Sequence, residues 1–433
     1  MSPELVGIIG IAVLLVLFAF RMSVGLSMLL VGFLGYSYLV STQAGLSKLG
    51  VDPFATASFY SLSVIPLFVL MGMFLSYGGL GRDLYKAVDT WMRHLRGGLA
   101  IATIGACAAF AAVSGSATAT SATMATVALP EMKRYNYKDS LATACVAAGG
   151  TLGILIPPSV ILILYGILTE ERIGQLFIAG ILPGVLQAVL FMLAIYLQVK
   201  HNPSLAPLRP EAAFRDKLTS LTKVWPVLVI FVLAMGGIYL GVFTPTEAGA
   251  VGAFGAFIIS LVTGRFSRGT LVGSLDQAAR TTAMIFLIVI GATVFGHFLA
   301  VTKIPFELSD FIAGLGISRY IVMALVLFLL FVLGTFMEGI AILVLSMPIL
   351  YPLVIDLGFN GVWFGVIMVI MLNIGLVTPP VGINVYITAG VAKDVPLMTI
   401  FRGVIPLWIA MIVCAILLVS FPQIATFLPS LMR

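Results

Sequence analysis

Long apolar stretches separated by short polar segments run through the chain from end to end. A helix needs about 20 apolar residues to cross a bilayer, and several stretches reach this length. The pattern therefore predicts an all-α polytopic membrane protein. Ten crossings are expected, over residues 5–20, 23–42, 56–77, 139–168, 176–199, 224–241, 245–263, 281–300, 361–390 and 400–420.

Two further apolar stretches, 98–130 and 320–352, are too long for one crossing and carry polar or glycine residues at their centres. Each is predicted to form a re-entrant hairpin of two half-helices, roughly 15 residues or 22 Å apiece. The tips of the hairpins are expected at Ser114–Thr118, SGSAT, and at Gly334–Gly339, GTFMEG.

Two of the predicted crossings contain adjacent prolines. Gly153–Ser159 is GILIPPS, and Gly375–Val381 is GLVTPPV. Proline lacks the backbone N–H and clashes with the preceding turn, so each pair should break its helix. Within hydrocarbon, a break leaves polar backbone groups unpaired unless protein or a water-filled cavity satisfies them. We therefore expect 139–168 and 361–390 to be broken helices that line an internal site.

The two halves of the chain match each other at a nearly constant offset. The proline motifs are 222 residues apart, and Gly115 matches Gly339 at an offset of 224. This predicts a first repeat at 1–199, a solvated linker at 200–223 and a second repeat at 224–433. Each repeat has five crossings and one hairpin, and because five is odd the repeats should be inverted. Inverted repeats with broken helices are typical of secondary transporters.

Charged residues are few and unevenly placed, since 61% of the 433 residues are hydrophobic and 9% are charged. If the N-terminus lies outside, 18 of the 23 Lys and Arg fall inside and 5 outside, as the positive-inside rule requires. We therefore expect both termini outside and loops 78–97, 131–138 and 200–223 in the cytoplasm. The pI near 9.2 then reflects basic loops rather than a nucleic acid or another anionic partner.

The residues at the hairpin tips and at the helix breaks are the candidates for binding Na⁺ and the substrate. Carbonyls at helix C-termini can coordinate Na⁺, and helix N-termini favour anions. A single hydroxyl in a membrane helix usually packs against a neighbouring helix or bonds to its own backbone. Several hydroxyls at a hairpin tip that lies opposite a helix break instead favour contact with an ion or a substrate. The candidate Na⁺ ligands are Ser114, Gly115, Gly153, Pro157, Thr335, Gly339, Asn373, Thr378 and Pro379. The candidate substrate contacts are Ser114, Ser116, Thr118, Ser159, Glu338 and Asn384.

Glu338 is the only ionisable acid or base near the middle of a predicted membrane segment. A charge at that depth costs at least ~2.5 kcal/mol on insertion scales, which favours a functional role over a buried ion pair. No constellation of nucleophile, base or metal ligands predicts an enzyme. A channel is the other alternative, but selectivity filters usually come from rings of subunits rather than from one inverted duplication.

Two amphipathic segments precede the hairpins. Residues 81–97 place Leu84, Val88 and Leu95 on one helical face, and Leu308 to Leu315 repeat the pattern more weakly. Such helices lie in the membrane interface, where they either brace a moving hairpin domain or act as ordinary connectors.

Three motifs resemble the large membrane subunit of tripartite ATP-independent periplasmic (TRAP) transporters. They are SGSATATSATMATVALPEMKRYNY, GGTLGILIPPSVILILYGILTEERIGQLFIAGILPG and FTPTEAGAVGAFGAF, and the similarity covers essentially the whole chain. The resemblance implies an elevator-type transport domain that contains both hairpins, a driving Na⁺ gradient and a bacterial inner membrane with both termini periplasmic. It also implies a small four-helix membrane subunit, expected on a separate chain, and a periplasmic substrate-binding protein.

By this resemblance the substrate is an organic acid, either sialic acid or a C4-dicarboxylate. One acidic side chain and many hydroxyls at the tips suit a polyhydroxy monocarboxylate better than a dianion, so sialic acid is the expected substrate. Its carboxylate should face the half-helix ends near Ser116 and Ser159, and Glu338 should face hydroxyls or an amide, since it would repel a carboxylate.

Overall fold

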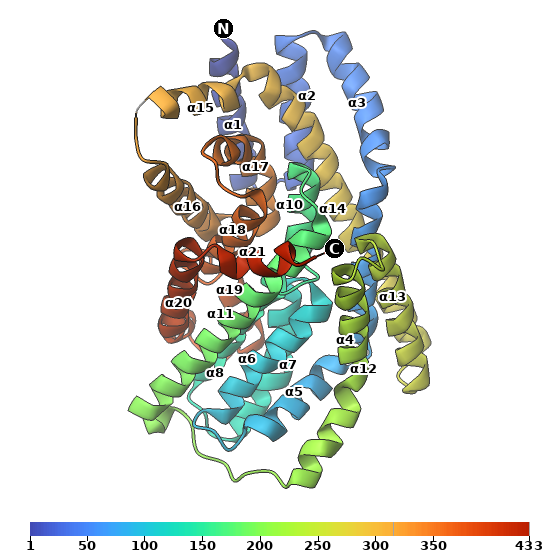
Figure 1. Ribbon diagram of the computed structural model, residues 1–433, viewed down its shortest axis with the longest axis vertical. Helices are drawn as coiled ribbons and strands as arrows, with labels where there is room; N and C mark the ends of the chain where they lie inside the picture. Colours follow the sequence, from blue (N-terminus) through green and yellow to red (C-terminus); the bar gives the residue numbers. More distant parts are fainter. Residues whose placement is uncertain (315, 433) are drawn as a thin grey trace.

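The computed structural model describes residues 1–314 and 316–432, and the regular elements in these residues are all helices (Figure 1). Leu315 of the second amphipathic segment and Arg433 of the predicted outer cations lie outside the described residues. The helices are α1 Pro3–Ala19, α2 Val24–Leu39, α3 Thr42–Ala57, η1 Tyr60–Ser63, α4 Val64–Tyr77, α5 Leu80–Met92, α6 Gly98–Ser114, α7 Ala117–Arg134, α8 Asp139–Gly150, α9 Leu152–Leu155, α10 Val160–Thr169, α11 Ile173–His201, η2 Pro203–Leu205, α12 Phe214–Tyr239, α13 Pro245–Val262, α14 Arg268–Thr302, α15 Ile304–Gly314, α16 Arg319–Phe336, α17 Gly339–Asp356, α18 Gly361–Gly375, α19 Ile383–Val391, α20 Leu397–Ser420 and α21 Gln423–Ser430.

The predicted class, an all-α polytopic membrane protein, is confirmed. Among the described residues, 9 helical segments are long and apolar enough to cross a membrane, and α1, α2, α6 and α18 are apolar but shorter. All ten ranges predicted as crossings are helical or broken-helical. Several helices begin at side-chain caps, as at α13, where Thr244 and Glu247 form a reciprocal capping box.

Each predicted hairpin is a pair of helices joined by a very short turn. In the first, α6 ends at Ser114 and α7 begins at Ala117. In the second, α16 continues to Phe336 and α17 begins at Gly339, so the turn consists of Met337 and Glu338. The prediction placed this second tip over 334–339, which is wider than the turn because Gly334 still belongs to α16.

Two segments differ from the sequence-based prediction. The sequence predicts a connection where the structure has α3, because the glycines, Pro53 and polar residues of this segment form no apolar run. The helix is stabilised instead by a cap at Ser41 and by the buried Asp52, which pairs with His297. The linker 200–223 is less solvated than predicted, since Ala206 and Ala212 are buried. Its last ten residues, 214–223, already belong to α12.

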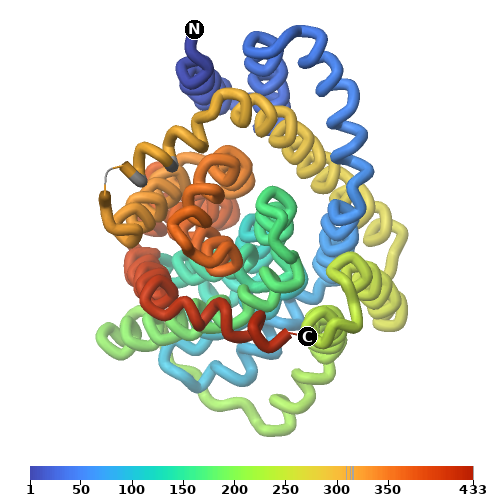
Figure 2. Tube along the Cα trace, turned by 45° about the horizontal axis from the view of Figure 1, so that its top comes forward, coloured from blue at the N-terminus to red at the C-terminus, as the bar shows by residue number. Residues whose placement is uncertain are grey.

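The helices form an outer arc around an inner cluster (Figures 1 and 2). In the arc, which contains α1–α4 and α12–α14, α2 packs along α14 and α4 packs along α13. In the inner cluster, hairpins and broken helices pack across the two halves of the chain: α7 contacts α19, and α10 contacts α17. Helix α5 joins the two groups by packing on both α6 and α12.

Candidate functional site

The first tip is a tight turn that leaves no room for a side chain at its apex. Gly115 has a φ of +61°, the left-handed region that favours glycine. A Cβ there would lie 2.8 Å from Pro158 O, so the turn is pressed against the broken helix. Ser116 then caps α7 by accepting a hydrogen bond from Ala119 N at 3.3 Å.

The first break consists of residues 156–159, between α9 and α10, as the two prolines predicted. Ser159 caps α10: its hydroxyl accepts from Leu162 N at 3.3 Å and donates to Ile154 O at 2.6 Å. Pro158 therefore precedes the cap of α10. Ser159 is fully buried and both its bonds go to the backbone, so the structure gives it a capping role, while its substrate contact stays a prediction.

The first oxygen cluster lies where this tip meets this break. Thr120 Oγ1 is 2.7 Å from Ser114 Oγ and donates to Ser116 O at 2.8 Å. Gly153 packs directly against this pair, because a Cβ on it would collide with Ser116 O and Thr120 Oγ1. We call these oxygens, contributed by Ser114, Ser116 and Thr120, the first oxygen cluster.

Two polar side chains near the first oxygen cluster have atoms without a partner. Gln187 is fully buried in α11 and donates to Thr151 Oγ1 at 3.3 Å, while its Oε1 accepts no hydrogen bond among the described residues. Ser121 Oγ is also buried and unpartnered, and it lies against Gly150. The sequence analysis missed Gln187 and Thr151, because a single polar residue in an apolar helix carries no pattern.

The second tip and break repeat the backbone contact of the first. Val160 N donates to Gly115 O at 3.4 Å, and Val381 N donates to Thr335 O at 3.3 Å. In both halves of the chain, therefore, an N–H just after the two prolines bonds to a carbonyl at or near the tip. Gly375 packs so closely on Gly334 that a Cβ on Gly375 would collide with the Gly334 backbone.

Around the second break, some of the predicted ligands already have hydrogen-bond partners and others have none. Thr378 Oγ1 donates to Ile374 O at 2.5 Å and accepts from Trp408 Nε1 at 2.9 Å. Asn373 is fully buried, and neither of its amide atoms has a partner among the described residues. Pro379 differs from its counterpart Pro157, because Pro379 is exposed and Pro157 is buried.

Asn384 is also fully buried and faces the other half of the chain. Its Nδ2 donates to Ala147 O at 3.2 Å, and its Oδ1 has no partner among the described residues. Asn384 does not line the central cavity described next, and its contact with the substrate stays a prediction. Asn384 N donates to Leu376 O at 3.1 Å, three residues after Asn373, so both asparagines belong to the second break. For brevity we call their amide oxygens, which accept no hydrogen bond among the described residues, the second oxygen cluster.

A central cavity of about 480 Å³ brings both tips together. Five consecutive residues of the first tip, Ser114–Thr118, line it, and Glu338 and Gly339 line it from the second tip. Glu338 occupies the position just before α17 without a side-chain capping hydrogen bond; its side chain is exposed and makes no ion pair among the described residues. Helices α4 and α14 of the outer arc close the other side, where Gln277 and Thr281 add polar groups that the sequence analysis did not single out.

These features define a class: a multi-pass membrane protein whose two hairpins and two broken helices surround a cavity with polar groups at both tips. The comparisons with known proteins then place the chain. Residues 11–424 match the family model described as "Tripartite ATP-independent periplasmic transporter, DctM component". The chain belongs to this family, as the large membrane subunit of a TRAP transporter.

Relatives agree with this assignment, and one solved structure shares the fold. The C4-dicarboxylate TRAP transporter large permease of Pseudomonas aeruginosa is 36% identical over 395 residues, which cover 90% of this chain and 91% of the relative. The sialic acid TRAP transporter large permease of Vibrio cholerae is 32% identical over 95% of both chains. The crystal structure of the Alcanivorax borkumensis YdaH transporter has the same fold, with a TM-score of 0.65, 14% identity and coverage of 88% of this chain and 89% of that one.

Proposed function

We propose that the protein takes up an organic acid by coupling its transport to Na⁺. The observation that carries this proposal is the central cavity, where hydroxyls of one tip face the carboxylate of the other across about 480 Å³. Cavities of this size and mixed polarity hold small ligands. The family itself consists of transporter subunits, which supports a transporter rather than an enzyme.

We propose that the substrate carboxylate binds at the N-terminus of α7. Ser116 caps this helix, and the hydroxyls of Ser116 and Thr118 are 3.0 Å apart at the cavity wall. The positive end of the helix dipole favours bound anions. Glu338 would repel a carboxylate, so it faces hydroxyl or amide groups at the other end of the substrate.

Two substrates fit this arrangement. A single acidic side chain opposite a row of hydroxyls suits sialic acid, a polyhydroxy monocarboxylate. A C4-dicarboxylate is supported equally by the comparisons, because a relative named for it is 36% identical and one named for sialic acid is 32% identical.

The Na⁺ ions are assigned to the two oxygen clusters. The first offers Ser114 Oγ, Thr120 Oγ1 and Ser116 O beside the break at Gly153. The second offers the unpartnered amide oxygens of Asn373 and Asn384 near the other break. Oxygen groups at broken helices are the ligands that secondary transporters use for Na⁺.

We further propose that the chain is an inverted duplication that works by an elevator movement. Two observations support the duplication: α2–α14 and α4–α13 are matching contacts, and each tip bonds to the break of its own repeat. The charge distribution supports periplasmic termini in the inner membrane. The family description supports a periplasmic substrate-binding protein and a separate small four-helix membrane subunit as partners.

Reconstitution tests the proposal. The protein, its small subunit and its binding protein are placed in liposomes, and labelled sialic acid and a labelled C4-dicarboxylate are offered with and without an inward Na⁺ gradient. Accumulation of one acid above its external concentration, lost when the gradient is collapsed, is expected. Equal uptake in Na⁺-free buffer, or equilibration without accumulation, would contradict coupled transport.

The variant Glu338→Gln tests the substrate site itself. Because Glu338 makes no ion pair within the described residues, the variant should insert and assemble normally. A hydrogen bond to a charged group contributes about 1.5–3 kcal/mol, so the substrate concentration for half-maximal uptake should rise roughly tenfold or more. Unchanged uptake across substrate and Na⁺ titrations would remove Glu338 from the site.

A further inference from the structure

A second cavity, of about 430 Å³, lies among the basic loops, at the end of α7 opposite to the first tip. Helix α5, the C-terminal turns of α7 and the linker segment around Arg209 form its walls. We call it the basic cavity. None of its lining residues lines the central cavity, and the proposed transport does not use it.

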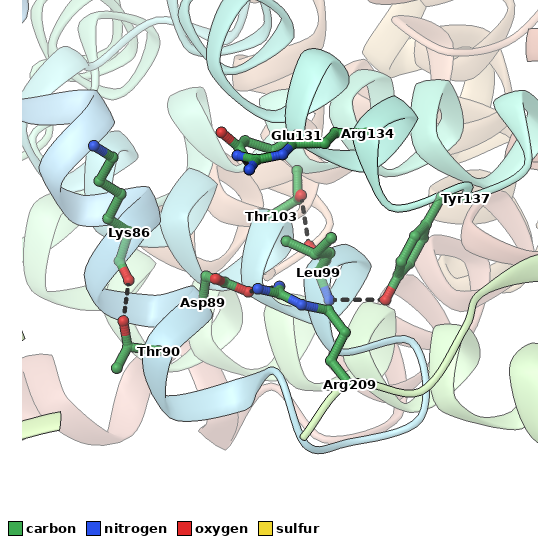
Figure 3. A network of polar contacts seen from close by, with 9 residues as sticks. All are labelled: Lys86, Asp89, Thr90, Leu99, Thr103, Glu131, Arg134, Tyr137 and Arg209. Carbon is green, nitrogen blue, oxygen red and sulfur yellow. Dashed lines mark hydrogen bonds and ion pairs between the residues drawn. The ribbon is translucent and has the colours of Figure 1, made fainter. Parts of the chain in front are cut away.

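One ion pair holds the linker wall of the basic cavity in place. Arg209 donates to Asp89 Oδ1 at 2.7 Å, and its guanidinium lies over the ring of Tyr135, 3.9 Å from the centroid. The two charged side chains are only 11% and 18% exposed. Figure 3 shows this pair between the α5 segment that carries Lys86 and the α7 segment that carries Glu131 and Arg134. Arg209 therefore neutralises Asp89.

The remaining charges give the basic cavity a positive excess. Arg82 and Lys86 are four residues apart on α5, so they share one side of that helix. Both are exposed, and neither makes an ion pair among the described residues. The one other carboxylate that lines the cavity, Glu131, is 4.0 Å from Arg134. Two cations thus face the cavity without a carboxylate of their own.

Tyr85 supplies an unpartnered donor in the same wall. Its side chain lines the basic cavity and is 2% exposed, and its hydroxyl has no hydrogen-bond partner among the described residues. Burial, followed by the nearby Asp89 carboxylate, raises the pKa of Tyr85, and the Thr103 hydroxyl beside it offsets part of this rise, so the Tyr85 hydroxyl keeps its proton. A buried donor without an acceptor costs free energy, which a bound ligand would recover.

We propose that the basic cavity binds a phosphate-bearing anion, the group shared by phospholipid head groups and soluble phosphorylated molecules. A phosphate presents several acceptor oxygens, and the guanidinium of Arg82, the ammonium of Lys86 and the hydroxyl of Tyr85 are matching donors. The amphipathic α5 places these donors at the depth of the membrane interface, where anionic head groups collect at basic segments.

A bound phosphate would connect three parts of the molecule. Helix α5 packs on α6 and on α12, the end of α7 closes the first hairpin, and the segment around Arg209 joins the two halves of the chain. The anion would therefore link the end of the first hairpin that lies away from its tip to the outer arc of helices. This inference does not depend on the identity of the transported substrate, so it can fail while the proposed function stands.

Binding is tested with the full-length protein and three variants. Arg82→Gln/Lys86→Gln removes the unpaired cations, and Tyr85→Phe removes the unpartnered hydroxyl while keeping the ring. Arg96→Gln is the matched control, because Arg96 is an exposed cation of the neighbouring loop that does not line the cavity. Two probes separate the sources: native mass spectrometry after exchange into phosphatidylglycerol or phosphatidylcholine, and thermal stabilisation by inorganic phosphate.

We expect the double variant to bind the anionic probe roughly tenfold more weakly, Tyr85→Phe to bind it several-fold more weakly, and the control to match the wild type. Selective retention of phosphatidylglycerol identifies a head group as the ligand, and stabilisation by phosphate identifies a soluble one. Tyr85→Phe should be at least as stable as the wild type without ligand, which separates lost binding from lost folding. If neither probe distinguishes the wild type from the double variant, the proposal is wrong.

Discussion

Thr120 contacts both of the other residues in the first oxygen cluster. Its hydroxyl meets Ser114 Oγ and also donates to Ser116 O, so it bridges both sides of the first tip. A serine-rich tip could be recognised in the sequence, but the sequence could not say which hydroxyls point at one another. That selection depends on the turn at Gly115 and on the packing of Gly153 against it.

Thr120→Val should weaken Na⁺ binding, because it removes one ligand oxygen and keeps the branched shape. The Na⁺ concentration for half-maximal transport should rise roughly tenfold, since one hydrogen bond or ligand to a charge contributes about 1.5–3 kcal/mol. The measurement is uptake at graded Na⁺. Thr143→Val, in α8 with a hydroxyl bonded only to its own backbone at Asp139 O, is the control and should behave as wild type.

Ser159→Ala should lower stability and leave substrate affinity unchanged, because the structure gives this hydroxyl two backbone bonds at the cap of α10. Loss of a cap costs about 1 kcal/mol. Thermal unfolding in detergent measures the first effect, and uptake at graded substrate measures the second. A raised substrate requirement with unchanged stability would support the direct substrate contact that the sequence predicts.

At the scale of elements, the hairpins and breaks were predictable because they interrupt apolar segments with glycine, serine and proline. Both broken helices and the first turn lie where these signals placed them. Helix α3 was not predictable by the same reasoning. It has no apolar run, and its stability depends on the pairing of Asp52 with His297, which lies 245 residues away in the sequence.

The contact between the first tip and the first break predicts a steric test. Gly153→Ala should abolish transport, because the new methyl group would collide with Ser116 O and Thr120 Oγ1 and push the tip away. Gly236→Ala, in α12, is the matched control: nothing lies within 4 Å of its added methyl group. Both variants should appear in the membrane in wild-type amounts. Normal uptake by the Gly153 variant would mean that the tip and the break are not packed as described.

At the scale of the whole molecule, the apolar lengths and the charge distribution predicted the class of protein before any contact was known. They could not predict that one arc of helices surrounds an inner cluster, since that arrangement depends on which apolar faces meet. The cavity walls contributed by α4 and α14 follow from the same packing. A single polar residue such as Gln277 can be recognised as part of the cavity wall only when this packing is known.

Side-specific labelling tests the proposed orientation. Cysteines placed singly at Lys138 and at Lys303, both exposed, should react with membrane-impermeant reagents from the cytoplasm and from the periplasm, respectively. The three native cysteines are fully buried and should not react, so they serve as an internal control. Labelling of both positions from the same side would rule out the inverted arrangement.

The bonds that join each tip to its break run between main-chain atoms, Val160 N to Gly115 O and Val381 N to Thr335 O. Main-chain atoms do not depend on side-chain chemistry, so apart from the glycine that the first turn requires at Gly115, this framework places few demands on the side chains beside it. Positions that face the cavity, such as Thr118 and Ile161, are therefore free to change during evolution while the tips stay attached. A lineage could acquire a new nutrient by altering these side chains alone, which explains how one architecture can serve relatives named for chemically different acids.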